Sequence, residues 1–171
     1  HLLQPGQGWV PLWKSDLYPF ERHYEWYQHR YGAPGSCFDN YLLAGGDLVA
    51  AFTRRCRERG VAPFISLRMN DCHGKEYADL TKADIERFQI KFPLVFCISK
   101  FYSEHPEDRL FDDPEYYLPD EDIFAFADNP GLRWRLRHAR PFNWLIPEVR
   151  EHQMELIAEL CRKYDIDGFE M

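Results

Sequence analysis

The sequence predicts an α/β fold of the (β/α)8 TIM-barrel type, of which it carries the N-terminal half, about strands one to four, with a long insertion after strand two. Strand-like and helix-like segments alternate from residue 37 onward, and their short connections are typical of parallel βαβ units. A complete barrel takes about 250 residues, whereas this chain has 171 and ends in another strand-like segment. We therefore expect residues 37–171 to be a half-barrel truncated at Met171, whose partner is the missing C-terminal half.

An aromatic-rich segment, residues 1–36, precedes the predicted barrel. Within it, Phe20, Tyr24 and Tyr27 recur at i, i+4 and i+7, which predicts a short helix over residues 19–31. We expect this aromatic stripe to pack inward as a lid on the core. The alternative is an exposed platform on which a sugar ring stacks.

The first predicted βαβ unit runs from Cys37 to Met69. Residues 37–43 resemble a strand, and Asp47 is a good N-cap for a helix that Gly60 stops. Apolar residues recur on one face of that helix. A short apolar run at residues 63–69 then predicts the second strand.

The middle of the chain is less regular. Thr81 is a candidate cap for a helix over residues 82–91, and residues 94–98 have strand propensity. Ser99 is a candidate cap for a short helix that ends at His105. Residues 106–131 are acidic and rich in proline, which predicts a long functional or disordered loop.

The last third has the clearest pattern. Residues 140–144 predict a short third strand, and Pro147 suits the first turn of a long helix. Residues 166–171 predict the fourth strand. Because strand side chains alternate, we expect Gly168 and Glu170 to face into the barrel and Asp167 to face the helices, where it suits backbone or arginine contacts.

Composition excludes several classes of protein. The chain has 28 acidic and 21 basic residues and a formal charge of −7, which argues against a nucleic-acid partner. No apolar stretch approaches the about 20 residues of a membrane span. Its five cysteines include no CxxC pair, so a zinc ribbon is unsupported. No signal peptide is visible, and a secreted or periplasmic location stays open.

Two segments resemble a known family. The run PEVREHQMELIAELCRKYDIDGFEM, residues 147–171, is similar to the third helix and fourth strand of the family-10-like glycosylhydrolases, a group of (β/α)8 proteins. The preceding Asn143–Trp144 pair fits the same pattern, and SLRMNDCH at residues 66–73 resembles the second-strand segment of bacterial members. The resemblance implies hydrolysis of glycosidic bonds. Many members carry paired aspartates after the fourth-strand Asp-Gly, where this chain has Glu170.

Glu170 is the candidate catalytic residue. It lies at the end of the fourth predicted strand, and barrel enzymes place their sites at the strand ends. A carboxyl group there suits a general acid/base or a sugar ligand; the alternative is a structural salt bridge. Glycoside hydrolysis needs two carboxyl groups, about 5–5.5 Å apart for retention and about 6.5–9.5 Å for inversion, and the second one stays unassigned.

The end of the second predicted strand carries four candidate substrate-binding residues: Arg68, Asn70, Asp71 and His73. Amide, carboxylate and imidazole groups bind sugar hydroxyls as donors or acceptors. Asn70 and Asp71 are also good turn formers, so they have a structural alternative.

The end of the third predicted strand adds Asn143 and Trp144 as substrate-binding candidates. The Trp144 ring suits stacking on a sugar face or a place in the core.

The sequence therefore predicts a glycoside hydrolase-like protein with a carbohydrate substrate, no resident metal and no cofactor. One alternative is a non-catalytic carbohydrate-binding barrel. Another is a metal-dependent hydrolase, which predicts a metal ion in contact with Asp71 and His73 together.

Overall fold

The computed structural model describes residues 1–32, 37–71, 73–87, 98–110 and 140–171. Its helices are α1 (Phe20–Tyr31), α2 (Cys37–Leu43), α3 (Leu48–Glu58), the 3-10 turn η1 (Lys75–Tyr77), α4 (Lys82–Arg87), α5 (Lys100–Glu104), the 3-10 turn η3 (Pro106–Asp108) and α8 (Pro147–Lys163). Its strands are β1 (Leu2–Leu3), β2 (Gly6–Gln7), β3 (Val10–Pro11), β4 (Phe64–Ser66) and β5 (Gly168–Glu170).

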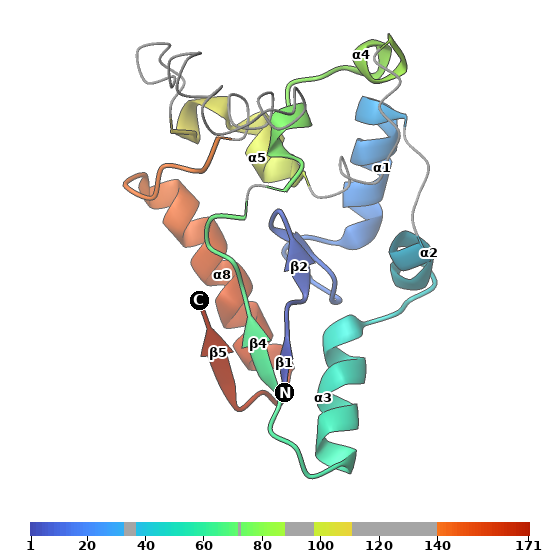
Figure 1. The fold of residues 1–171 in the computed structure, drawn as a ribbon, viewed down its shortest axis with the longest axis vertical. Coiled ribbons are helices and arrows are strands. Elements are labelled where there is room, and N and C mark those ends of the chain that lie inside the picture. Colours follow the sequence, from blue (N-terminus) through green and yellow to red (C-terminus); the bar gives the residue numbers. More distant parts are fainter. Residues whose placement is uncertain (33–36, 72, 88–97, 111–139) are drawn as a thin grey trace, which may run out of the picture.

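The main sheet has three parallel strands in the order β1-β4-β5 (Figure 1). Leu2 pairs with Phe64, and Phe64 pairs in turn with Gly168. The expected parallel unit therefore exists, but its first strand is β1 rather than residues 37–43. Strands β2 and β3 form a separate antiparallel hairpin.

The prediction of a (β/α)8 half-barrel is wrong. Residues 37–43 form helix α2, with Asp39 and Leu42 buried at a helical spacing, and they contribute no strand. Within residues 140–144, only Phe142 makes a β-bridge, with Arg109, and it joins neither sheet. The described part of the chain therefore holds three parallel strands, and these do not close into a cylinder.

Other expected elements agree with the structure where it describes them. Asp47 caps α3 by accepting a hydrogen bond from the Ala50 amide at 2.9 Å, and Gly60 ends that helix with a positive φ of 64°. Ser99 caps α5 through the Tyr102 amide at 3.1 Å. Thr81 precedes α4 as expected, and its hydroxyl accepts from the Asp84 amide at 3.2 Å. Residues 88–97, and with them the strand predicted at 94–98, lie outside the described residues apart from Ile98.

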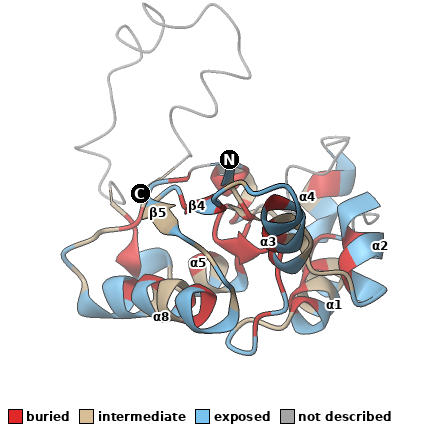
Figure 2. Cartoon of the chain, turned by 90° about the horizontal axis from the view of Figure 1, so that it is seen from below, coloured by how far each residue is buried: buried red, intermediate tan, exposed pale blue. Residues whose placement is uncertain are grey.

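Helices cover one face of the sheet. Ile65 of β4 is fully buried in a core cluster with Val49 of α3 and with Leu156 and Leu160 of α8. In Figure 2, α8 shows one buried side and one exposed side, as its amphipathic pattern predicts. Phe169 of β5 packs against the same cluster.

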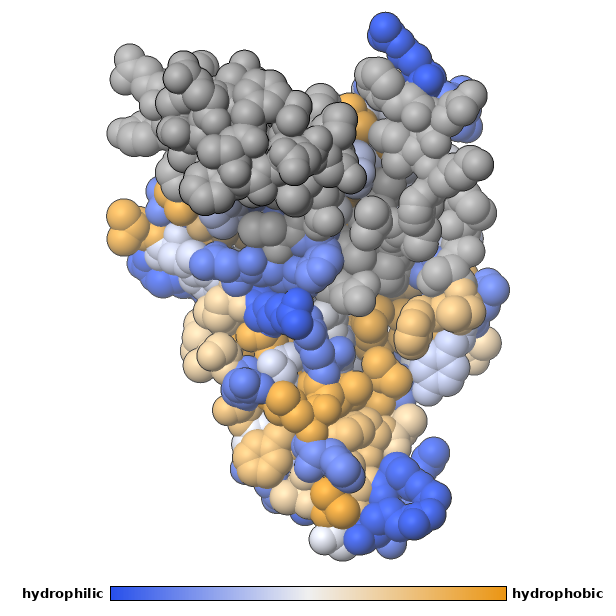
Figure 3. All heavy atoms as spheres, in the orientation of Figure 1, coloured by the Kyte–Doolittle hydropathy of each residue, from blue (hydrophilic) through white to orange (hydrophobic). Residues whose placement is uncertain are grey.

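The opposite face of the sheet is open. Leu2 and Phe64 are 54% and 40% exposed. Figure 3 shows hydrophobic residues gathered over the lower half of this face, where the strands lie in Figure 1. Glu170 is exposed at the end of β5.

An arginine on α3 binds the segment that leads into β5. The Arg57 guanidinium donates to the carboxylates of Asp165 and Asp167, with a shortest distance of 2.7 Å to each. These contacts raise the pKa of Arg57 and lower that of Asp165. The arginine contact expected for Asp167 is confirmed.

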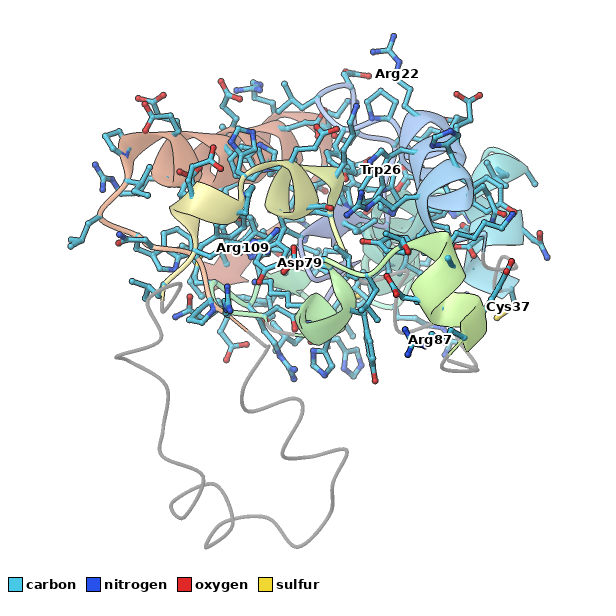
Figure 4. All side chains as sticks on the ribbon, turned by 90° about the horizontal axis from the view of Figure 1, so that it is seen from above. Arg22, Trp26, Cys37, Asp79, Arg87 and Arg109 are labelled. Carbon is cyan, nitrogen blue, oxygen red and sulfur yellow. The ribbon has the colours of Figure 1, made fainter. Side chains whose placement is uncertain are left out.

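Aromatic residues build a second core cluster above the sheet. Of the predicted stripe, Phe20 and Tyr27 are buried and Tyr24 is partly buried against the same cluster, so the stripe faces inward as expected. On the same side of the molecule, Arg109 and Asp79 lie next to each other (Figure 4), with 2.8 Å between Nη1 and Oδ1. The Arg109 guanidinium also donates to the Tyr102 carbonyl at 2.7 Å, so this buried cation is well paired.

Candidate functional site

The candidate site lies beyond the carboxyl ends of β1 and β4. A small pocket opens there, with room for a group the size of one water molecule. Its walls come from the hairpin, from the residues after β4 and from α8: Gly6, Trp9, Val10, Pro11, Trp13, Leu67, Arg68, Asp71, Gln153 and Leu156. Open parallel sheets bind ligands outside the carboxyl ends of their strands, so this is where a ligand site is expected.

The hairpin brings Trp9 to the pocket through a tight turn. Gly8 and Trp9, the two residues between β2 and β3, have φ of 56° and 71°. Positive φ at both positions defines a type I′ turn, which normally selects glycine or asparagine. A tryptophan at the second position is strained, so other contacts must hold it there.

Asp71 supplies one of those contacts. It is 5% exposed, and its Oδ2 accepts from the Gly8 amide at 2.9 Å. Its Oδ1 accepts from the His73 amide at 3.1 Å and also pairs with His73 Nδ1. Burial raises the pKa of Asp71, but the hydrogen bonds from Gly8 and His73 outweigh burial and hold the pKa below its usual value. Asp71 is therefore an ionised anchor for the turn.

Trp144 and Asn70 meet at the rim of the site. Trp144 Nε1 donates to Asn70 Oδ1 at 2.6 Å, and the Trp144 side chain is partly exposed. The Trp144 carbonyl accepts from Arg150 at 2.7 Å. Asn143 instead serves the local turn, because its Oδ1 accepts from the Leu145 amide at 3.0 Å.

An aromatic cluster supports this rim from below. The ring of Trp9 stacks on Phe142 with centroids 4.5 Å apart and meets the ring of Trp144 at 5.3 Å. The ammonium of buried Lys75 lies 4.8 Å from the Tyr102 ring centroid and 5.5 Å from that of Trp9. These cation–π contacts stabilise the cluster on which Trp144 rests.

The structure unites some predicted site residues and leaves others apart. Asn70 contacts Trp144, Asp71 contacts His73, and Arg68 lines the same pocket as Asp71. Glu170 lies at the same edge of the sheet, where its carbonyl accepts from the Leu67 amide at 3.0 Å. Its side chain makes no hydrogen bond or ion pair with another described residue.

Sequence reasoning missed Trp9 and Gln153. Both line the pocket and are buried, at 6% and 2% exposure. The sequence Gly-Gln-Gly-Trp contains turn-forming glycines, but it does not reveal the type I′ turn that places the Trp9 side chain at the pocket. Gln153 lies in the middle of α8 and interrupts its apolar stripe, which was the available signal.

No group of three or more potential metal ligands gathers among the described residues. None of the helices in that part of the chain is long and apolar enough to cross a membrane. No protein-family model matches the chain, and no curated protein matches it.

Proposed function

We propose that the chain is a carbohydrate-active protein that binds a sugar at the carboxyl ends of its parallel strands. One observation carries this proposal. The Trp144 indole is partly exposed and is fixed by the Asn70 side chain at 2.6 Å, beside a pocket with polar groups in its wall. An oriented aromatic face next to hydrogen-bonding groups suits a ligand with one apolar ring face and several hydroxyls.

Binding is favoured over hydrolysis as the primary activity. Hydrolysis needs two carboxyl groups, one of which must donate a proton. Asp71 is unsuited to that role because its hydrogen bonds keep it ionised and occupied. The other two pairs of site residues, Asn70 with Trp144 and Asn143 with the Leu145 amide, bring no second acid.

A glycan panel tests the binding proposal. We expect saturable binding of at least one glycan, and we expect Trp144→Ala to weaken it by about two- to tenfold, because stacking of this kind contributes about 0.5–1.5 kcal/mol. Trp144→Phe keeps an aromatic face and should lose less. Calorimetric titration of each variant measures these effects.

The matched control is Trp26→Phe on α1 (Figure 4), which alters another partly buried tryptophan and should leave binding unchanged. A panel with no binder, or equal affinities for the wild type and Trp144→Ala, would refute the proposal.

Hydrolysis by Glu170 is the second candidate. It is favoured by the exposed position of this carboxylate at the end of β5, the same sheet edge that bears the pocket. If Glu170 acts on a bound sugar, Glu170→Gln abolishes product release from the glycan identified on the panel and leaves its binding intact. Unchanged turnover in a folded Glu170→Gln variant would remove Glu170 from the reaction.

A further inference from the structure

Two buried polar atoms in the pocket wall lack hydrogen-bond partners among the residues that the structure describes. Trp9 Nε1 and Gln153 Oε1 are both inaccessible to solvent and form no hydrogen bond with any described residue. Their side chains line the same pocket. A buried donor or acceptor that stays unpaired destabilises the folded chain, so a group that pairs with these atoms is bound favourably.

The two residues are also held in place. Trp9 has a positive φ of 71°, and the Gly8 amide beside it is tied to Asp71 at 2.9 Å. Its ring is packed on Phe142. Gln153 belongs to the 17-residue helix α8, between buried Val149 and Leu156. A site built from fixed side chains loses little conformational entropy when it binds a ligand.

The chemistry of these atoms selects the ligand. An indole N–H can only donate, whereas an amide oxygen can only accept. An alcohol hydroxyl does both, and it satisfies either orientation of the Gln153 amide. The ionised carboxylate of Asp71 in the same wall disfavours an anion, and Val10, Leu67 and Leu156 suit the neutral carbon that bears a hydroxyl.

We propose that this pocket is a subsite for one alcohol hydroxyl of a neutral ligand, which pairs with Trp9 Nε1 and the Gln153 side-chain amide. The inference rests on the proposed function and deepens it. The rings of Trp9 and Trp144 lie 5.3 Å apart, so a sugar stacked on Trp144 has the subsite within reach.

The test follows the indole N–H signal of Trp9 by NMR, assigned with Trp9→Phe. Ethylene glycol is the hydroxyl probe, and acetate is the matched anion. We expect a saturable shift of the Trp9 signal with ethylene glycol and none with acetate. Gln153→Leu should raise the half-saturation concentration at least tenfold, and Gln153→Met provides a second variant of nearly the same length, with folding checked from the amide spectrum. Gln28→Leu on α1 is the control and should change nothing.

A shift that is linear in ethylene glycol and equal in the wild type and both Gln153 variants would overturn the proposal, because the pocket then holds water only. An equal response to acetate would overturn it as well. Failure of the subsite proposal can be distinguished from failure of the sugar-binding proposal. Trp144-dependent glycan binding without a response at Trp9 refutes the subsite alone, whereas a saturable ethylene glycol shift without glycan binding supports the subsite and refutes the proposed sugar.

Discussion

Trp9 occupies a backbone conformation that large side chains rarely adopt, and its neighbours explain how it persists. The Gly8 amide is tied to Asp71, while the Trp9 ring packs on Phe142 and Trp144. Strain of about 1–3 kcal/mol is therefore offset by contacts that converge on one residue. Such convergence at a pocket is typical of ligand sites rather than of plain turns.

His152 provides a pH-dependent contribution to stability. Its ring stacks on Phe101 with centroids 4.0 Å apart, and its Nε2 is buried without a hydrogen-bond partner among the described residues. Burial, with a smaller effect of the nearby His105, lowers its pKa from 6.5 to about 4. The unfolded chain therefore binds a proton more readily than the folded one. The contribution is complete above about pH 6.5 and is lost as the pH falls toward 4.

We predict that His152→Phe makes stability less sensitive to acid while it keeps a ring on Phe101. The wild type should lose about 2 kcal/mol of unfolding free energy from this residue between pH 7 and pH 4.5, and the variant should lose correspondingly less. Urea unfolding at both pH values measures the difference. His29→Phe, at an exposed position on α1, is the control. Equal acid sensitivity of the wild type and His152→Phe would show that His152 is not the titrating group.

At the scale of elements, Asp47 connects two helices. Its Oδ1 caps α3 through the Ala50 amide, and its Oδ2 accepts from the Tyr164 hydroxyl at 2.6 Å at the end of α8. Burial and the carboxylate together raise the pKa of Tyr164. One side chain thus fixes the relative position of the two helices that cover the sheet.

We predict that Asp47→Ala lowers the free energy of unfolding by about 2 kcal/mol, roughly half from the lost cap and half from the lost tyrosine hydrogen bond. Asp47→Asn keeps a good cap and an acceptor, so it should lose less than half as much. Chemical denaturation of the three proteins measures this. If Asp47→Asn is as unstable as Asp47→Ala, the capping argument is wrong.

Elements with strong local signals could be predicted from the sequence. Asp47, Ser99 and Pro147 mark the starts of α3, α5 and α8, because capping chemistry involves only neighbouring residues. The segment at 37–43 was predicted as a strand but forms α2, because a segment of only seven residues is too short for its pattern to distinguish a strand from a helix. Contact with α1, which no local pattern reveals, decides in favour of a helix.

At the scale of the whole molecule, the sheet depends on pairing between distant segments. The two-residue strand β1 pairs with β4, whose partner residues lie 62 positions further along the chain. In addition, the His1 carbonyl accepts from the Phe64 amide at 2.8 Å, and the His1 ammonium donates to the Ala62 carbonyl. So short a strand leaves no alternating pattern in the sequence. The barrel was therefore predicted from the wrong set of strands. The segments of β4 and β5 were expected as strands of one parallel sheet, but a third strand at residues 140–144 was expected between them, whereas they pair directly.

The candidate site was predictable only where it depends on residues close together in the sequence. Asn70, Asp71 and His73 follow β4 directly, so their place at the strand ends follows from the position of one strand. The contact between Asn70 and Trp144 spans 74 residues, and the anchor from Asp71 to Gly8 spans 63. Only the folded chain brings these pairs together.

The central claim is that a sugar binds at the carboxyl ends of these strands. Chemical-shift mapping with the tightest glycan from the panel tests it most directly. We predict that the largest changes occur at the Trp144 indole, the Asn70 side-chain amide and the backbone amides of Asp71 and His73. Changes confined to α2 or the far end of α3, with these four signals unmoved, would contradict the claim.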